Sequence, residues 1–92
     1  MTNASQGPEH IRATVREFIL EEFLPGAEAH ELTDQTPLVT GGILDSLATV
    51  RVVAFLEDRY GIEIAPHEAS VDYLDTVDAI ARLVNTKQTR AP

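Results

Sequence analysis

The chain has 92 residues, in which 15 Asp and Glu side chains outnumber 7 Lys and Arg side chains and give a formal charge of -8 at pH 7. This length suits one small domain. So acidic a chain is a poor partner for nucleic acid, because phosphate binding needs a basic patch. The absence of cysteine excludes disulfides and thiolate metal sites.

The first ten residues carry no recognisable targeting signal. They lack the basic start and the apolar run of a signal peptide, and no apolar stretch of the chain approaches membrane-spanning length. We therefore expect a soluble, cytoplasmic protein that does not bind a membrane. Residues 1–7 are small and polar, a composition that predicts a flexible N-terminus.

The first predicted helix begins at Pro8, a residue tolerated in a first turn, and ends at Leu24-Pro25-Gly26. Its apolar residues recur at helical spacing: Ile11, Val15, Phe18, Ile19 and Phe23. Residues 25–44 then form a long connection that is rich in proline, glycine and turn formers. Such long loops are usually functional or packed by their own apolar residues, here Leu32, Leu38, Val39, Ile43 and Leu44.

The second predicted helix opens at Asp45 or Ser46 and runs to Tyr60, with Gly61 as its left-handed stop. One side of this helix is expected to face the core: Thr49, Val52, Val53, Leu56 and Tyr60. The opposite side is also partly apolar and comprises Leu47, Val50, Arg51, Ala54, Phe55 and Asp58. Either this outer side binds a partner or the long loop covers it.

The remaining elements are shorter. Residues 62–64 alternate like a strand but are too few to make a sheet, and residues 66–74 indicate a short helix or turn. Asp75 is a good N-cap for a last helix that carries Val77, Ile80, Ala81 and Val84. We thus predict an all-α fold, a small four-helix bundle of three main helices plus one short helix. The folded domain spans residues 8–85, and residues 86–92 form a flexible tail.

Ser46, at the start of the second helix, has three interpretations. It or Asp45 caps the helix, or it is a catalytic nucleophile, or it is a substrate that another enzyme modifies. Catalysis needs a positioned base, but the histidines are scattered, and the glycine pattern of a nucleophile elbow is missing; those histidines are His10, His30 and His67. A helix N-terminus favours a negative group, which suits an attached phosphodiester.

The segment Gly42-Ile43-Leu44-Asp45-Ser46-Leu47 resembles the modification motif of acyl carrier and peptidyl carrier proteins, which are phosphopantetheine-binding carrier domains. Three further segments match this family in register: Thr36-Pro37-Leu38, Gly61-Ile62-Glu63-Ile64 and Leu74-Asp75-Thr76-Val77. The resemblance implies a non-catalytic carrier in which Ser46 receives 4′-phosphopantetheine from coenzyme A and bears its cargo as a thioester. Asp45 would help the transferase to recognise the motif. The partner-binding surface would comprise Leu47, Val50, Arg51 and Ala54.

The resemblance also implies a monomeric carrier with a set of enzyme partners. These are a phosphopantetheinyl transferase, an adenylating ligase or acyltransferase that loads the cargo, and downstream condensing or tailoring enzymes. Fatty-acid-synthesis carriers line the second helix with acids, whereas here Ala48 and Arg51 stand at such positions. This departure favours a discrete carrier in specialised metabolism of polyketide or nonribosomal peptide type. The alternative is an unmodified helical adaptor that binds a partner through the outer side of the second helix, with Ser46 only as a cap.

Other polar features have simpler interpretations. The histidines lack the spacing of metal ligands, so we predict surface residues and no metal site. The carboxylates of Glu21-Glu22 and Glu57-Asp58 are expected to be solvated. Tyr60 and Tyr73 are expected at the edge of the core with their hydroxyls near water.

Overall fold

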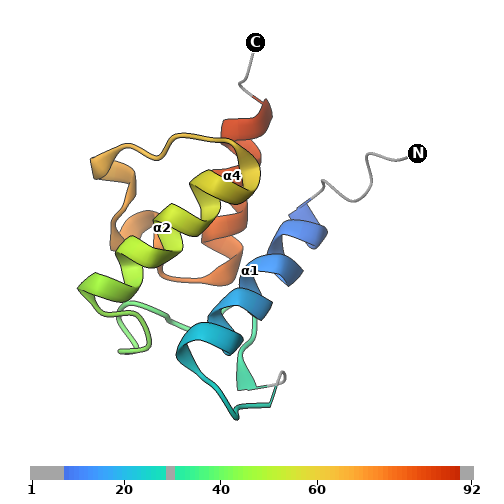
Figure 1. Cartoon of the computed structure of the whole chain (residues 1–92), viewed down its shortest axis with the longest axis vertical. Helices are drawn as coiled ribbons and strands as arrows, with labels where there is room; N and C mark the ends of the chain where they lie inside the picture. Colours follow the sequence, from blue (N-terminus) through green and yellow to red (C-terminus); the bar gives the residue numbers. More distant parts are fainter. Residues whose placement is uncertain (1–7, 29–30, 90–92) are drawn as a thin grey trace.

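The computed structural model describes residues 8–28 and 31–89, and the only regular secondary structure within these ranges is helical (Figure 1). Its elements are α1 (Pro8–Phe23), α2 (Ser46–Tyr60), the 3-10 helix η3 (Pro66–Glu68), α3 (Val71–Leu74) and α4 (Val77–Thr89). The predicted all-α bundle of three main helices and one short helix is confirmed. Residues 62–64 do not form a strand, and residues 66–74 form η3 and α3.

α1 buries one side chain per turn. Ile11, Val15 and Ile19 recur every fourth residue and are almost completely buried, which is the pattern of a helix with one face against a core. The helix ends at Phe23, ahead of Pro25, and the chain then turns at Gly26, whose φ of 93° favours glycine. The predicted first helix is confirmed.

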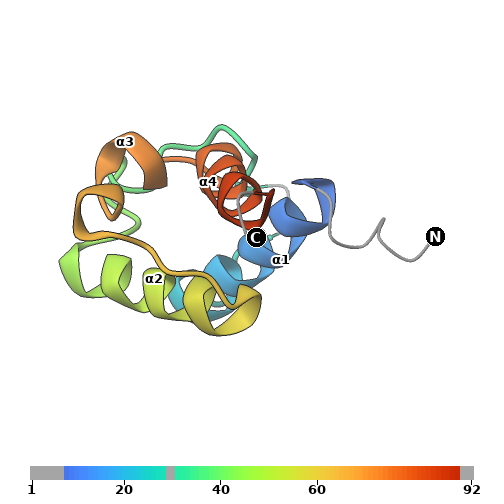
Figure 2. The ribbon, with the colours of Figure 1, turned by 90° about the horizontal axis from the view of Figure 1, so that it is seen from above.

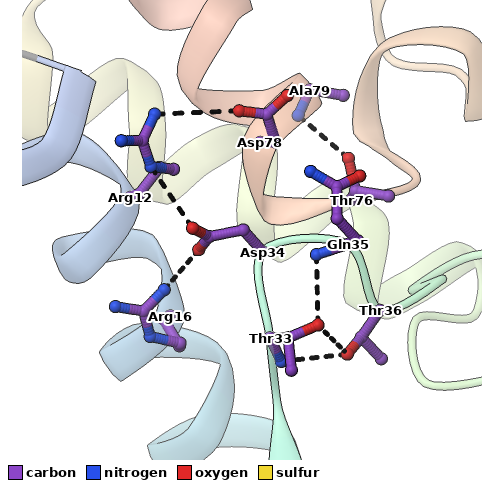
Figure 3. Close-up of polar contacts among 9 residues, drawn as sticks. All are labelled: Arg12, Arg16, Thr33, Asp34, Gln35, Thr36, Thr76, Asp78 and Ala79. Carbon is purple, nitrogen blue, oxygen red and sulfur yellow. Dashed lines mark hydrogen bonds and ion pairs between the residues drawn. The ribbon is translucent and has the colours of Figure 1, made fainter.

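The long loop between α1 and α2 packs onto the bundle along the lower side of Figure 1. Leu32, Leu38 and Leu44 are buried, as expected, and carry the loop across the ends of the helices. An ion-pair network also holds the loop. Asp34 pairs with Arg12 and Arg16 of α1, and Arg12 also pairs with Asp78 of α4 (Figure 3).

α2 ends as the sequence predicts. Gly61 adopts the left-handed conformation, with φ 65°, and its amide donates to the carbonyl of Glu57 at 2.9 Å. The Glu57 side chain also accepts a hydrogen bond from the amide of Ile64 at 2.9 Å. The expectation that Glu57 is only solvated is therefore wrong, because its carboxylate orders the chain that leaves α2.

α4 begins later and ends later than predicted. Thr76, not Asp75, is its cap, because the Thr76 hydroxyl accepts the amide of Ala79 at 2.9 Å. At the other end α4 continues to Thr89, so residues 86–89, predicted as the start of a flexible tail, are helical. An ion pair between Lys87 and Glu68 joins this last turn to η3 and, with the amide of Ala65, lowers the pKa of Glu68. The flexible segments predicted at residues 1–7 and 90–92 lie outside the described residues.

α4 is the central element of the bundle. It contacts α1, α2 and α3, and in Figure 2 it lies between α1 and α3 with α2 on a further side. Its fully buried residues Val77, Ile80, Ala81 and Val84 face the core, as predicted. In the part of the chain that the structure describes, no helix has both the length and the apolar character needed to cross a membrane.

Candidate functional site

The start of α2 assigns different roles to two adjacent residues. Asp45 has extended backbone angles (φ -86°, ψ -171°), and its Oδ1 accepts the amide of Ala48 at 2.8 Å. Asp45 is therefore the N-cap, and Ser46 is the first residue of the helix. Of the two caps that the sequence left open, the structure selects the aspartate.

Ser46 is exposed, and its hydroxyl does not cap the helix. Among residues 8–28 and 31–89, no hydrogen bond engages its side chain. The opposite holds at Thr49, whose hydroxyl donates to the carbonyl of Asp45 at 2.9 Å. Because the cap bond is made by Asp45, the Ser46 hydroxyl is exposed and takes no part in capping α2.

The chain before Ser46 forms a tight turn. The carbonyl of Leu38 accepts the amides of Ile43 and Leu44, each at 2.9 Å. Glycine is needed at Gly41 because a Cβ there would lie 2.3 Å from the carbonyl oxygen of Pro37. The sequence indicated the glycines and the buried Leu44. It did not indicate that the carbonyl of Leu38 closes the turn by accepting the amides of Ile43 and Leu44.

Asp75 fastens that turn to the bundle from the other side. Its Oδ1 accepts the amides of Val39 and Thr40 at 2.9 Å each, and the Thr40 hydroxyl lies 3.0 Å from Oδ2. These donors favour the charged form, so the pKa of Asp75 lies below the usual aspartate range, with the Thr40 amide as the largest cause. The sequence does not indicate this role because Val39 and Thr40 are 36 and 35 positions away from Asp75.

A mainly apolar groove adjoins Ser46 and has a volume of about 340 Å³. It runs between α2 and the segment before α3. Its walls are Val39, Thr49, Val50, Val53, Ala69, Ser70 and Val71. A flexible group attached to Ser46 would therefore have an apolar surface within reach.

The outer side of α2 is open, so the long loop does not cover it. Leu47 is 77% exposed and Val50 is 64% exposed, and Arg51 and Ala54 are also exposed. Phe55 departs from the expected outer surface because it stacks on Phe18 of α1, with ring centroids 4.0 Å apart.

Ala48 also departs from the expected surface. It is only 7% exposed and belongs to the core. Its methyl group packs with the other buried apolar side chains at the start of α2. Ala48 therefore contributes to the packing at the start of α2 rather than to its exposed outer side.

Arg51 is held in place by the end of α1. Its guanidinium donates to Glu22 at 2.7 Å and lies 5.4 Å from the centroid of the Phe23 ring. Glu22 is exposed, as predicted, and also pairs with Arg51, which the sequence did not indicate. A second groove, of about 430 Å³, lies here and is lined by Phe23, Ile43, Asp45, Leu47, Ala48, Val50 and Arg51.

The remaining candidate residues lie apart from the start of α2. His10 and His67 are exposed, as predicted, and His30 lies outside the described residues. Within the described ranges no group of three or more potential metal ligands occurs. Tyr73 is 39% exposed, but the hydroxyl of Tyr60 is buried and unpartnered among the described residues, so its predicted contact with water is wrong.

Comparison with known proteins places these features in context. A family model described as the phosphopantetheine attachment site matches residues 13–84. A solved chain described as "Crystal structure of FAD-dependent dehydrogenase" is 38% identical, with a TM-score of 0.69 over 76% of this chain and 97% of that chain. Another, described as "Structure of KstB-PCP(apo)", is 25% identical, with a TM-score of 0.67 over 89% of this chain and 90% of that one.

Proposed function

The chain belongs to the family of carrier domains with a phosphopantetheine attachment site, whose members are non-catalytic in general, and its cofactor is 4′-phosphopantetheine. From this premise we propose that the protein is a discrete acyl or aminoacyl carrier in which Ser46 bears the phosphopantetheine arm. The arm carries a biosynthetic intermediate as a thioester on its terminal thiol. The chain has no cysteine, so the cofactor is its only source of a thiol.

The observation that carries the proposal is the exposed hydroxyl of Ser46, which has no hydrogen-bond partner among the described residues. Asp45 supplies the cap bond to Ala48, and this leaves an exposed alcohol at the first position of α2. In the proposed transfer, the Ser46 oxygen bonds to the phosphorus next to pantetheine and the diphosphate bond of coenzyme A breaks. Adenosine 3′,5′-bisphosphate leaves, and the hydroxyl proton passes to a base of the transferase.

The surroundings of Ser46 suit the product. The first amides of a helix have no acceptor within the helix, and the positive end of the helix dipole favours a phosphodiester. The groove that begins at Ser46 offers the arm an apolar path past Val50 and Val53. Asp45 carries a negative charge beside the site, which fits the proposed role of a recognition mark for the transferase better than that of a phosphate ligand.

The outer side of α2 is the proposed partner surface, with Leu47 and Val50 as apolar contacts and Arg51 and Ala54 beside them. Leu47 and Val50 are the most exposed large apolar side chains among the described residues, and such exposure in a small domain marks an interaction site. We propose that the transferase, the loading ligase or acyltransferase, and later condensing or tailoring enzymes dock here in turn.

We place this carrier in specialised metabolism of the polyketide or nonribosomal peptide type. Arg51 supports this, because it puts a positive group where fatty-acid-synthesis carriers present acids, and the likeness to a chain named as a PCP supports it further. The 38% identity to a carrier-sized chain described with an FAD-dependent dehydrogenase makes a flavin dehydrogenase a candidate tailoring partner. The proposed location is the cytoplasm.

The test is coexpression with a broad-specificity phosphopantetheinyl transferase, followed by intact-mass measurement. We expect the wild-type chain to gain the mass of one phosphopantetheine and Ser46→Ala to gain none. A gain that survives Ser46→Ala, or no gain by the wild type, contradicts the proposal.

Asp45→Asn separates the two roles of Asp45. Asparagine caps helices about as well as aspartate, so this variant keeps its stability while losing the charge. Slower modification of Asp45→Asn, at unchanged unfolding free energy, supports recognition of the carboxylate by the transferase. Modification at the wild-type rate contradicts that role.

The adaptor hypothesis makes the opposite prediction. It gave Ser46 only a capping role, which Asp45 fills instead. An adaptor would bind its partner equally well with Ser46→Ala. We expect instead that this variant folds normally and fails to support product formation in a reconstituted pathway.

A further inference from the structure

The carboxylate of Asp75 binds the long loop by four hydrogen-bond contacts. It accepts the amides of Val39 and Thr40 at 2.9 Å, and the Thr40 hydroxyl lies 3.2 Å from Oδ1 and 3.0 Å from Oδ2. The backbone carbonyl of Asp75 also accepts the amide of Leu38. Three consecutive loop residues are therefore fixed to one residue at the start of α4.

These bonds extend to the modification site through the turn. The carbonyl of Leu38 accepts the amides of Ile43 and Leu44, and only Asp45 separates Leu44 from Ser46. Val39, whose amide is held by Asp75, also lines the groove that adjoins Ser46. Asp75 thus fixes both the approach of the chain to Ser46 and one wall of the groove.

We propose that Asp75 is a positioning residue for the transfer of phosphopantetheine to Ser46, and that it acts by holding residues 38–44 in the conformation that the transferase binds. This inference rests on the proposed function. A loop that is already ordered before docking loses little conformational entropy when the transferase binds, so binding is more favourable. When the loop is free, only a fraction of molecules is competent, and the apparent affinity falls by that fraction.

Asp34 is the matched control on the same loop. It is also an aspartate, and its ion pairs with Arg12 and Arg16 attach the loop to α1 (Figure 3). Its attachments lie before Leu38, outside the turn that closes on Ser46. Loss of the Asp34 side chain therefore removes the ion pairs to α1 and leaves the contacts that hold residues 38–44 in place.

The test measures the steady-state rate of phosphopantetheine transfer from coenzyme A by a broad-specificity transferase, with the carrier concentration varied. For Asp75→Ala we expect KM for the carrier to rise about tenfold with kcat little changed, because docking selects the ordered loop. Asp75→Asn keeps an acceptor oxygen and should fall between wild type and Asp75→Ala. Asp34→Asn should stay within about twofold of wild type.

Amide hydrogen exchange distinguishes positioning from general loosening. In Asp75→Ala we expect faster exchange at Ile43 and Leu44 and unchanged exchange in α1. Equal transfer kinetics for Asp75→Ala and wild type, or an equal rise in KM for Asp34→Asn, would overturn the inference while the proposed function stands. A wild-type chain that gains no phosphopantetheine overturns both.

Discussion

α2 and α4 start with the same pattern of an acid, a hydroxyl residue and an aliphatic residue, yet the two starts use it differently. At α2 the pattern is Asp45-Ser46-Leu47, in which the acid caps the helix and the hydroxyl makes no hydrogen bond to any residue that the structure describes. At α4 it is Asp75-Thr76-Val77, the hydroxyl caps the helix and the acid binds the loop. The difference is a shift of one residue in where the helix begins.

This shift determines which side chain caps the helix and which one does not. When the acid is the cap, the hydroxyl projects from the first helical residue toward solvent, as at Ser46. When the hydroxyl is the cap, the acid precedes the helix and can reach another segment, as Asp75 does. The aliphatic residue follows the same logic, because Leu47 is 77% exposed while Val77 is fully buried.

The largest expected difference in the free energy of unfolding is between substitutions of the two aliphatic residues, Val77 and Leu47. Val77→Ala should lower the free energy of unfolding by roughly 1.5–3 kcal/mol, because the side chain is fully buried in the core. Leu47→Ala should change it by no more than about 0.5 kcal/mol, because the side chain is exposed. Urea unfolding of both variants measures the difference. Comparable losses would show that the two starts are not divided into core and surface as described.

At the hydroxyl position, the variant at the start of α4 should again lose more unfolding free energy than the variant at the start of α2, but the difference should be smaller. Thr76→Ala removes the cap bond to Ala79 and should cost about 1 kcal/mol. Ser46→Ala removes no hydrogen bond within the described residues and should cost less than about 0.5 kcal/mol. Thermal and urea unfolding measured in parallel test this. A loss at Ser46→Ala as large as that at Thr76→Ala would show that Ser46 contributes to the helix start.

The sequence was sufficient to predict what depends on local pattern. Helical spacing predicted the core of α1, and Gly61 predicted the end of α2 because few other residues tolerate its φ of 65°. At the start of α4 the sequence predicts the wrong cap, because N-cap propensity favours aspartate over threonine and therefore Asp75 over Thr76. The choice depends on Val39 and Thr40, which are far away in sequence and compete for the Asp75 carboxylate.

Contacts between elements explain the other misreadings. A helical wheel places Ala48 near the boundary between the two sides of α2, and only packing decides that it is buried. Likewise, nothing in the local sequence pairs Glu22 with Arg51 or brings Phe18 onto Phe55. The resemblance of residues 42–47 to a known modification motif singled out Asp45 and Ser46, but the local sequence did not decide which of the two caps α2.

The last prediction concerns the acid at the start of α4, Asp75, and the way in which the unfolding free energy depends on pH. The pKa of Asp75 is lowered in the folded state by its bonds to Thr40 and Val39, whereas in the unfolded chain it returns to about 3.9. The ionised form therefore stabilises the fold at pH values above the unfolded pKa, and this contribution is lost as the pH falls through the lowered folded pKa. Asp75→Asn has no such titration, so its unfolding free energy should fall less than that of wild type between about pH 6 and pH 3. Glu68, whose pKa is also lowered, is present in both proteins and cancels in the difference. Urea unfolding at several pH values measures this difference in unfolding free energy. A steeper fall of the unfolding free energy for Asp75→Asn than for wild type would mean that the ionised carboxylate does not hold the loop.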